Sequence, residues 1–365
     1  MNSMNIIKSV QNEKIKEISK LKNKKNRIEQ NRFLVNGIKC SYEYLKLKTI
    51  YQEYNKAKKE NQQLFFNDII INSELEYIII EENVYSKYLE YINTYKDLSK
   101  DLSDILSNNL LNNLLVEEDI KFKLYKYIYI NQEKIMIVSK EVFNKLTEHK
   151  NFEGVLLCIK YKYMDNVFNF NIDSNNNITN NTHNKLDYLV DKIKKYNDIV
   201  VLENVNDPGN LGSILRTMSA TGNKLLILAG DCVSQFSEKV IRSSMGAVFK
   251  IDIENVDFNT FKEILNQESI KEEYITVCTS LKGENLYTKK EKNVDNFNKN
   301  IIVFGNEANG LSLEMLKLIK NKITIPMEEN VNSLNLSISV AIILYELYRR
   351  KKYCIHNTNK IDNDV

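Results

Sequence analysis

Three short segments of the chain carry the residue types that could do chemistry. The first, ENVNDPGNLGSILRTMSATG at 203–222, contains one of the chain's two prolines and three of its ten glycines. It also contains Arg216, although 45 of the 51 basic residues are lysine. Lysine cannot reproduce the planar, forked donor set of a guanidinium group. The segment therefore predicts a sharp turn followed by a helix, with an arginine kept for its geometry.

The other two segments, VFGNEANGLS at 303–312 and IPMEENVNSLNLS at 325–337, have the same character. Each follows an apolar run and leads into a helical pattern. A turn between a strand and a helix exposes backbone amides to a ligand, and glycine allows the backbone to approach it closely. Neither G-x-G-x-x-G nor G-x-x-x-x-G-K-[ST] occurs, so the sequence indicates neither a dinucleotide fingerprint nor a P-loop.

The elements that must position these segments alternate between strand and helix. The expected strands are short and rich in Ile and Val, which is typical of strands buried on both faces; they lie at 198–205, 224–230, 248–253, 274–280, 300–307 and 322–327. The expected helices lie at 211–221, 237–246, 258–268, 312–320 and 335–351. This alternation predicts an α/β domain with a mostly parallel sheet. Ligands of such sheets bind at the carboxyl ends of the strands, where all three segments begin.

Taken together, the segments resemble motifs 1, 2 and 3 of the SpoU/TrmH family of RNA ribose 2′-O-methyltransferases, in the SPOUT class. The matching residues are Asn204, Asp207, Pro208, Asn210, Gly212, Ile214 and Arg216, then Gly305, Glu307 and Gly310, then Ile325, Pro326, Met327, Ser333, Leu334, Asn335 and Ser337. The resemblance covers about 198–351. It extends more faintly to the first part of the chain, which is similar to the family's ribosomal-protein-like substrate-binding domain. One departure there is Asn36, where the family usually has Glu before the glycine.

The resemblance implies methyl transfer from S-adenosyl-L-methionine to a ribose 2′-hydroxyl of RNA. It gives Arg216 the central role, either as a base or as a clamp on the adjacent phosphate. We favour the clamp, because arginine does not deprotonate in proteins. Asn210 would orient the ribose or Arg216, and Glu307 would hold that arrangement by charge-assisted hydrogen bonds. Ser333 and Asn335 would complete the catalytic set.

The resemblance also implies the partners of the site. The cofactor would lie on backbone groups near five residues, namely Thr279, Gly305, Ile325, Met327 and Leu334. No metal is needed, because the sulfonium is already a good leaving group. The strands would form a trefoil knot, and the last helix, apolar nearly all round, would be buried in a homodimer interface. A full-length architecture with a substrate-binding domain favours ribosomal RNA over transfer RNA.

Simpler interpretations exist for each residue. Asn210 could be only a helix N-cap, Pro208 only a turn former, and Arg216 only a surface partner of Glu203. At the level of function, the alternatives are a transfer RNA methyltransferase, a non-catalytic RNA-binding relative with the same fold, and an enzyme of another kind that uses a nucleotide cofactor. Cofactor binding separates the scaffold from the enzyme.

Charge is distributed unevenly along the chain. Residues 1–59 carry a net charge of +10 and the remainder −7, within a total of +3. Such a basic region suggests an RNA partner, although a solvated lysine-rich helix face would look the same. The five cysteines are far apart and odd in number, which fits reduced thiols in a cytoplasmic protein. We expect no signal peptide, no membrane span and no metal site.

The composition also divides the chain. Both prolines and eight of the ten glycines lie between 208 and 326. The sequence predicts an α/β substrate-binding domain at 1–165, an Asn-rich linker at 166–185, the methyltransferase domain at 186–353 and a frayed tail at 354–365. Strands of the first domain are expected at 32–37, 76–80, 134–139 and 154–161. The tyrosine-rich stretch 41–130 is expected to contain an insertion.

Overall fold

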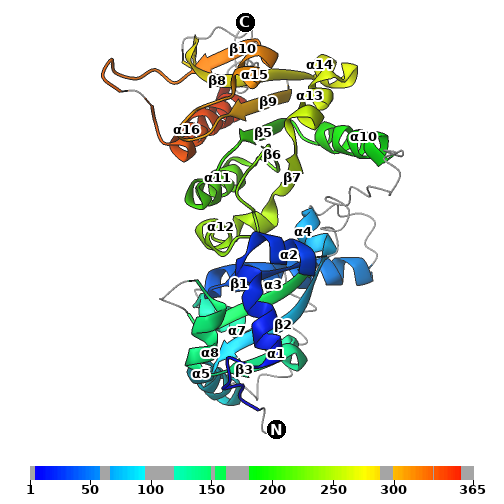
Figure 1. Ribbon diagram of the computed structural model, residues 1–365, viewed down its shortest axis with the longest axis vertical. Coiled ribbons are helices and arrows are strands. Elements are labelled where there is room, and N and C mark those ends of the chain that lie inside the picture. The colour runs from blue at the N-terminus through cyan, green and yellow to red at the C-terminus, as the bar shows by residue number, and fades with distance from the viewer. Residues whose placement is uncertain are drawn as a thin grey trace, which may run out of the picture. The chain divides into compact units, whose positions relative to one another are not determined.

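A computed structural model describes residues 5–57, 66–94, 119–148, 153–161, 181–287, 299–331 and 333–354. By its internal contacts the chain divides into two compact units. The first comprises residues 1–168 together with 236–249, and the second comprises 169–235 and 250–365 (Figure 1). Within the described residues, no helix combines the length and the apolar character that a membrane span requires.

The second unit is built on a six-stranded sheet in which every pair is parallel, in the order β10-β8-β9-β5-β6-β7. The strands are β5 (Asp198–Glu203), β6 (Leu225–Ala229), β7 (Asp252–Val256), β8 (Tyr274–Asn285), β9 (Lys299–Phe304) and β10 (Asn321–Thr324). The predicted α/β fold with a mostly parallel sheet is confirmed. The chain leaves β5 toward β6 on one side, and β9 lies on the other, so the strand order reverses between β5 and β9.

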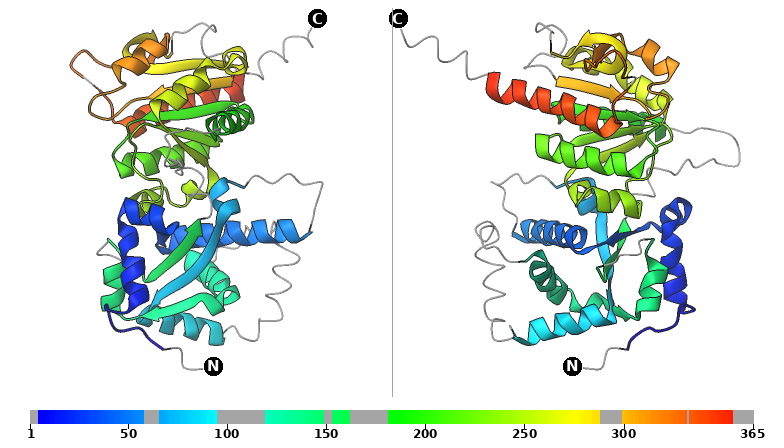
Figure 2. Two further views of the ribbon diagram at one scale, coloured as in Figure 1. Left: turned by 45° about the vertical axis from the view of Figure 1, so that its right-hand side comes forward. Right: turned by 90° about the vertical axis from the view of Figure 1, so that its left-hand side faces the viewer.

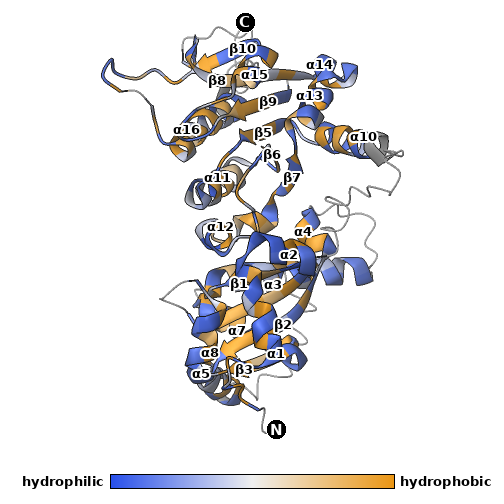
Figure 3. Ribbon diagram, in the orientation of Figure 1, coloured by the Kyte–Doolittle hydropathy of each residue, from blue (hydrophilic) through white to orange (hydrophobic). Residues whose placement is uncertain are grey.

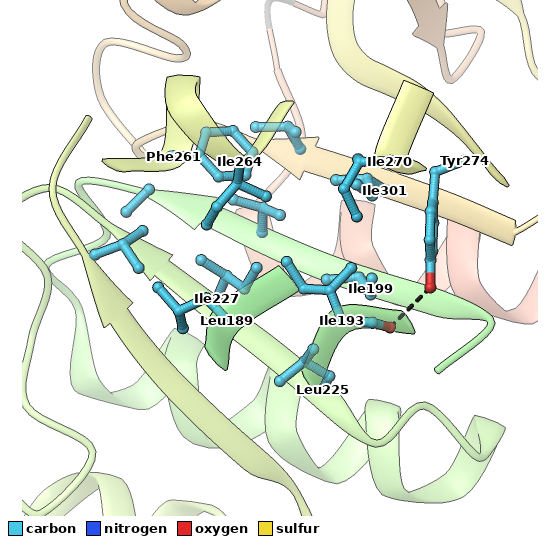
Figure 4. Close-up of a cluster of buried hydrophobic side chains, with 14 of the residues drawn as sticks. Leu189, Ile193, Ile199, Leu225, Ile227, Phe261, Ile264, Ile270, Tyr274 and Ile301 are labelled. Carbon is cyan, nitrogen blue, oxygen red and sulfur yellow. Dashed lines mark hydrogen bonds between the residues drawn. The ribbon is translucent and has the colours of Figure 1, made fainter. Parts of the chain in front are cut away.

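Helices cover this sheet on both faces. They are α10 (Asn181–Lys194), α11 (Pro208–Thr221), α13 (Phe258–Asn266), α14 (Glu268–Glu273), α15 (Leu313–Leu318) and α16 (Leu336–Arg349). Helices α11 and α16 pack against each other on one face (Figure 2). On the other face, residues of α10, α13 and α14 form a buried cluster with Ile199 and Ile227 (Figure 4). The hydroxyl of Tyr274 closes this cluster by donating to the carbonyl oxygen of Ile193, 2.7 Å away.

Hydropathy explains why the central strands are inside. Strands β5 and β9 are largely hydrophobic (Figure 3), and five of the six residues in each are fully buried. Successive side chains of a strand point to opposite faces. The four consecutive apolar residues of each strand, 199–202 and 301–304, therefore require helices above and below it, as observed.

The first unit contains a four-stranded mixed sheet, in the order β1-β4-β2-β3. Its strands are β1 (Arg32–Asn36), β2 (Ser73–Glu81), β3 (Ile135–Val138) and β4 (Val155–Tyr161), and each overlaps a predicted strand. Its helices are α1 (Glu13–Ser19), α2 (Lys24–Gln30), α3 (Ile38–Ala57), α4 (Asp68–Asn72), α5 (Glu82–Thr94), α7 (Ile120–Ile130), α8 (Lys140–Leu146) and α12 (Glu238–Ser243). Only β2 and β3 run parallel, and the other neighbours are antiparallel.

Helix α12 comes from the crossover between β6 and β7, yet it packs in the first unit. The ring of Phe236 lies 4.5 Å from that of Phe33, and the side-chain amide of Asn67 donates to the carbonyl oxygen of Val248 at 3.0 Å. Asn36 Nδ2 donates to Glu238 Oε1 at 2.6 Å. The family's usual Glu at that position would place two carboxylates together, so the departure at Asn36 suits its neighbour.

The same packing explains one wrong prediction. The strand expected at 248–253 begins only at Asp252, and residues Ala247–Lys250 form a 3₁₀ helix. Val248 and Phe249 are buried, and Phe249 packs on the ring of Tyr44 in the first unit. Their apolar character therefore reflects a different core from the one assumed.

Other predicted boundaries differ or are outside the described residues. The helix expected at 258–268 is two helices, α13 and α14, separated at Gln267. Of the predicted linker, residues 166–180 lie outside the described ranges, and the remaining five belong to α10. The predicted tail after Cys354 and parts of the stretch 41–130, at 58–65 and 95–118, are likewise outside them.

Candidate active site

The three sequence motifs meet at the carboxyl ends of β5 and β9. These strands are neighbours in the sheet although they are about a hundred residues apart. Motif 1 leaves β5 and motif 2 leaves β9, so they begin side by side. Motif 3 leaves β10 at the far edge of the sheet, and the irregular segment 325–335 brings it back. In open α/β sheets, ligands bind where the strand order reverses.

The turn of motif 1 sets the start of α11. Asn204 has a left-handed backbone (φ 53°), and its Oδ1 accepts from the amide of Asp231 at 2.9 Å. Asp207 is the N-cap of the helix, because its Oδ1 accepts from the backbone amide of Asn210 at 2.7 Å. Pro208 occupies the first helical position, where its missing N–H costs nothing. Asn210 is therefore not the N-cap, and its side chain is available for other contacts.

A chain of side-chain hydrogen bonds joins the three motifs. Asn210 Nδ2 donates to Glu307 Oε1 at 3.0 Å, and the amide of Asp207 donates to the same oxygen at 3.3 Å. Asn335 Nδ2 donates to Asn210 Oδ1 at 3.0 Å. Asn335 Oδ1 in turn accepts from the amide and the hydroxyl of Ser337, at 2.9 and 2.7 Å. Every donor points toward the carboxylate, so the carboxylate charge polarises the whole chain.

The site is open enough to receive a ligand. Asn210 is half-buried, while Glu307 and Asn335 are exposed. An asparagine side chain has two donor hydrogens and two acceptor lone pairs, and the bonds above use one of each at Asn210. The other donor and acceptor make no side-chain hydrogen bond within the described part of the chain.

A second set of contacts holds the loop of motif 2 against motif 1. Asn306 Nδ2 donates to the carbonyl oxygen of Asn204 at 2.7 Å, and Asn306 Oδ1 accepts from the amides of Ala308 and Asn309. The backbones of Asn306 and Gly310 exchange two hydrogen bonds of 2.9 Å. Asn306 is not among the predicted site residues, because it occupies a variable position of G-x-E-x-x-G. The Gly-Asn pair that follows the strand is a signal for such a turn.

The carboxylate of Glu203 fixes the other end of this loop. It accepts from the amide of Ser312 at 2.8 Å and from its hydroxyl at 2.6 Å, at the N-terminus of α15. Glu203 is 4% exposed. The alternative in which Arg216 only pairs with Glu203 is wrong, because Glu203 forms no ion pair with it.

The structure does not bring Arg216 to this chain of hydrogen bonds. Arg216 is six positions after Asn210 on α11. This spacing places it about 120° around the helix axis from Asn210 and about 9 Å along the axis. Arg216 is exposed and has no hydrogen bond or ion pair with any described residue. Ser333 is also exposed and without a side-chain hydrogen bond to the described residues. Their roles stay predictions.

The five predicted cofactor residues lie within or after three adjacent strands, β9, β8 and β10. Thr279 is in a bulge of β8: Cys278 pairs with Lys322, and the next pair of β10 is Ile323 with Glu284. Gly305 is buried at the end of β9, while Ile325, Met327 and Leu334 are half-buried in the irregular segment. The backbone amides of these last three donate no hydrogen bond to another described residue. These amides can therefore donate to a bound polar ligand.

A metal-binding cluster or a reactive cysteine would be another source of chemistry in the described residues. No group of three His, Cys, Asp or Glu side chains there is placed to bind a metal. Burial raises the pKa of the Cys278 thiol, and burial together with nearby Glu153 raises the pKa of Cys40 to about 12. Both thiols are therefore poor nucleophiles at neutral pH.

Comparison with known proteins identifies this arrangement. Residues 197–345 match the family model described as SpoU rRNA Methylase family, and residues 12–91 match the MRM3-like substrate binding domain. Residues 197–345 therefore form a domain of the SpoU/TrmH family. The matched ranges place the hydrogen-bonded motifs in the SpoU domain. They place the basic N-terminal region in the substrate-binding domain.

Individual relatives are similar to part of the chain. An uncharacterized tRNA/rRNA methyltransferase of Synechocystis is 34% identical over 152 residues, which are 42% of this chain and 53% of the relative. A 23S rRNA guanosine 2′-O-methyltransferase of Bacillus subtilis is 26% identical over 43% of this chain and 60% of the relative. The matches thus span little more than half of these relatives. The crystal structure of an AdoMet-bound rRNA methyltransferase from Sinorhizobium meliloti, 20% identical, shares the fold with a TM-score of 0.61 over 96% of this chain and 98% of that one.

Proposed function

We propose that this protein is an S-adenosyl-L-methionine-dependent methyltransferase that modifies a ribose 2′-hydroxyl of ribosomal RNA. The observation that carries the proposal is the hydrogen-bonded chain Glu307–Asn210–Asn335, which joins all three motifs at the point where the strand order reverses. A scaffold that only bound RNA would have no need to connect three distant segments through matched polar side chains.

The residues around the site fit the cofactor. The amides of Ile325, Met327 and Leu334 have no acceptor among the described residues and can bind its adenine and its polar methionine end. Gly305 follows the end of β9, and Thr279 is in the bulge of the neighbouring strand β8. When bound, the cofactor supplies an activated methyl group on a sulfonium. No metal is then required, because a good leaving group is already present.

Side chains of the protein position the ribose and its 2′-hydroxyl. Asn210 has one donor and one acceptor left for the ribose, and Glu307 holds its amide in one orientation. Asn335 does the same from the other side, through Asn210 Oδ1. Arg216 binds the phosphate next to the target nucleotide and stabilises the negative charge that develops on the 2′-oxygen. A guanidinium stays protonated, so it acts by charge and geometry.

Ribosomal RNA is the substrate that the relatives favour. The N-terminal region is similar to a substrate-binding domain named for the MRM3-like proteins, and one relative acts on 23S rRNA. Residues 1–59 are strongly basic, and several of their lysines on α1 and α2 are exposed, including Lys16, Lys24 and Lys25. Such a surface binds RNA through its phosphates. A transfer RNA substrate is the alternative, since other relatives are named tRNA/rRNA methyltransferases.

We also propose that the protein is a homodimer through α16. One side of this helix is buried, but Ile338 and Tyr345, seven positions apart, are each 51% exposed. The half-buried Ile342 lies between them on the same side. This apolar stripe on a helix of the SpoU unit is available for a second copy.

Mapping of ribose methylation in cells tests the proposed function. Ribosomal and transfer RNA from cells with and without the gene are digested, and 2′-O-methyl nucleotides are located by mass spectrometry. We expect one ribosomal position to lose its methyl group and to regain it when the gene is restored. Regain must fail with Asn335→Ala. Loss of a methyl group from transfer RNA alone would identify transfer RNA as the substrate. Unchanged methylation of both ribosomal and transfer RNA would contradict the proposed function.

A further inference from the structure

The six arginines of this lysine-rich chain are informative because lysine is its usual basic residue. Three of them donate from two nitrogens of the guanidinium. Arg32 binds two carboxylates, those of Glu17 and Glu76, and Arg349 and Arg350 both bind Glu346. A lysine, with its compact charge, does not reproduce this forked set of donors. A fourth, Arg27, donates from Nη1 alone to the carbonyl oxygens of Leu21 and Lys22.

The remaining two arginines, Arg216 and Arg242, have no hydrogen bond or ion pair with any described residue. Arg216 belongs to motif 1 and has a proposed role. Arg242 belongs to none of the three motifs. It lies on α12, is half-buried and is left without an assigned partner.

The acids that could neutralise Arg242 are engaged elsewhere. Glu238 is four residues earlier on α12, the usual spacing of a helical ion pair. Both of its oxygens are occupied, since Oε1 accepts from Asn36 Nδ2 at 2.6 Å and Oε2 from the amide of Glu148 at 2.9 Å. Glu43 packs beside the turn that ends α12, but its Oε1 binds Lys39 Nζ at 2.9 Å. Among the described residues, Arg242 therefore forms an ion pair with neither of these acids.

The turn that follows Arg242 presents an unusual residue to solvent. Met245 has a left-handed backbone (φ 52°), which is uncommon for a residue other than glycine, asparagine or aspartate. Its amide donates to the carbonyl oxygen of Arg242 at 3.1 Å, and its side chain is 46% exposed. The turn is held rigidly, because Ser244 is fully buried and donates to the carbonyl oxygen of Ile241 at 2.8 Å. Strained residues that the surroundings hold in place are common at ligand sites.

We propose that Arg242 and Met245 form an RNA-contact site at the end of α12. The Arg242 guanidinium binds a backbone phosphate, and the Met245 side chain packs on the sugar or base of the adjoining nucleotide. This inference rests on the proposed function, which makes RNA the ligand. It adds a contact outside the three motifs. Helix α12 packs within the unit that contains the substrate-binding domain, where the excess of positive charge also lies.

Binding of an unmodified 23S rRNA transcript tests this site. Affinity is measured for the full chain across a series of NaCl concentrations. Loss of one phosphate contact in Arg242→Ala should weaken binding by about tenfold and reduce the slope of log affinity against log salt by about 0.7 to 0.9. Arg242→Lys should recover the slope but not the affinity, because a point charge lacks the fork.

Two further variants separate contact from folding. Met245→Asn suits the left-handed turn better than methionine does, so its melting temperature should be unchanged or higher while RNA affinity falls several-fold. Lys262→Ala, which removes one charge from an exposed position of α13, is the matched control and should bind as wild type does. At saturating RNA, turnover by Arg242→Ala should equal that of wild type, with the defect confined to KM.

The site is refuted if Arg242→Ala binds within twofold of Lys262→Ala while wild type methylates the transcript. It is also refuted if Arg242→Ala lowers turnover and melting temperature together, since that result shows a structural role. In both cases, methylation of the transcript by the wild-type protein still supports the proposed function. If wild type neither binds nor methylates ribosomal or transfer RNA, the proposed function itself fails and the RNA site with it.

Discussion

Replacement of Asn306 by aspartate tests how the motif 2 loop positions the active site. Asn306 uses its whole side chain: Nδ2 donates to the carbonyl oxygen of Asn204 at 2.7 Å, and Oδ1 accepts from two amides of its own loop. The next residue, Glu307, holds Asn210. Aspartate keeps the two accepted bonds but replaces the donor with a carboxylate oxygen. That oxygen would face a carbonyl oxygen that has lost its partner.

The size of the effect follows from these contacts. Loss of one hydrogen bond costs about 1 kcal/mol, and an acceptor left without a partner adds a penalty of about 1–3 kcal/mol. A net change of about 2 kcal/mol in the placement of Glu307 corresponds to roughly a thirtyfold fall in kcat, because about 1.4 kcal/mol is a factor of ten. Affinity for the cofactor should change less than kcat, because only Gly305 of the five predicted cofactor residues adjoins Asn306 and three of them are in the segment 325–334.

The assay is single-turnover methyl transfer to an RNA transcript, with melting temperature and cofactor affinity measured alongside. Asn309→Asp is the matched control: the same chemical change occurs three residues later, where the side chain has no partner among the described residues. A double-mutant cycle with Glu307→Gln then isolates the coupling. If Asn306 acts through Glu307, Asn306→Asp should add little to the defect of Glu307→Gln.

Two results refute this reasoning. In the first, Asn306→Asp turns over as fast as Asn309→Asp while Glu307→Gln is impaired. In the second, the defects of Asn306→Asp and Glu307→Gln multiply in the double variant, as independent contributions do. Either result would mean that the hydrogen bonds of Asn306 do not position the side chain of Glu307.

Three further predictions concern other parts of the SpoU unit. Arg216→Ala should lose at least roughly a hundredfold in turnover and Arg216→Lys should be severely impaired, both with unchanged cofactor affinity by calorimetry; near-normal turnover in Arg216→Lys would show that charge alone suffices. Ile338→Lys should reduce the mass measured by analytical ultracentrifugation from dimer to monomer, whereas a monomeric wild type would contradict the proposed α16 interface. Hydrogen bonds from Arg349 and Arg350 lower the pKa of Glu346 from 4.5 to about 2, so its stabilising effect is complete above pH 4.5 and is lost as pH falls through 2. The difference in melting temperature between wild type and Glu346→Gln should shrink over that range, and a difference independent of pH would remove the ion pairs from the account.

Much of the fold was predictable because local patterns and global packing agree. The strands β5 and β9 are short apolar runs between turn residues, and a helix follows each, which leaves few alternatives to a parallel sheet. The segments that follow their carboxyl ends contain Asn210 and Glu307. The prediction that ligand-binding residues gather at those ends needed no knowledge of which strands are neighbours.

What failed was information that sequence pattern does not carry. Val248 and Phe249 read as strand because an apolar run does not say which core buries it, and here it belongs to the first unit. The bulge of β8 at 279–283 depends on its pairing with β10, which is a long-range property. The role of Asn306 could not be predicted, because it depends on a hydrogen bond to Asn204, about a hundred residues away in the sequence. The predicted knot and dimer are likewise global properties and stay predictions.

The most direct test of the central claim is transfer of a labelled methyl group in vitro. The full chain is incubated with methyl-labelled S-adenosyl-L-methionine and an unmodified 23S rRNA transcript, and the digested RNA is analysed by mass spectrometry. We expect label on the ribose 2′-oxygen of a single nucleotide, and no label when Asn335 is replaced by alanine. Label on a base, or equal labelling by wild type and the Asn335→Ala protein, would contradict it.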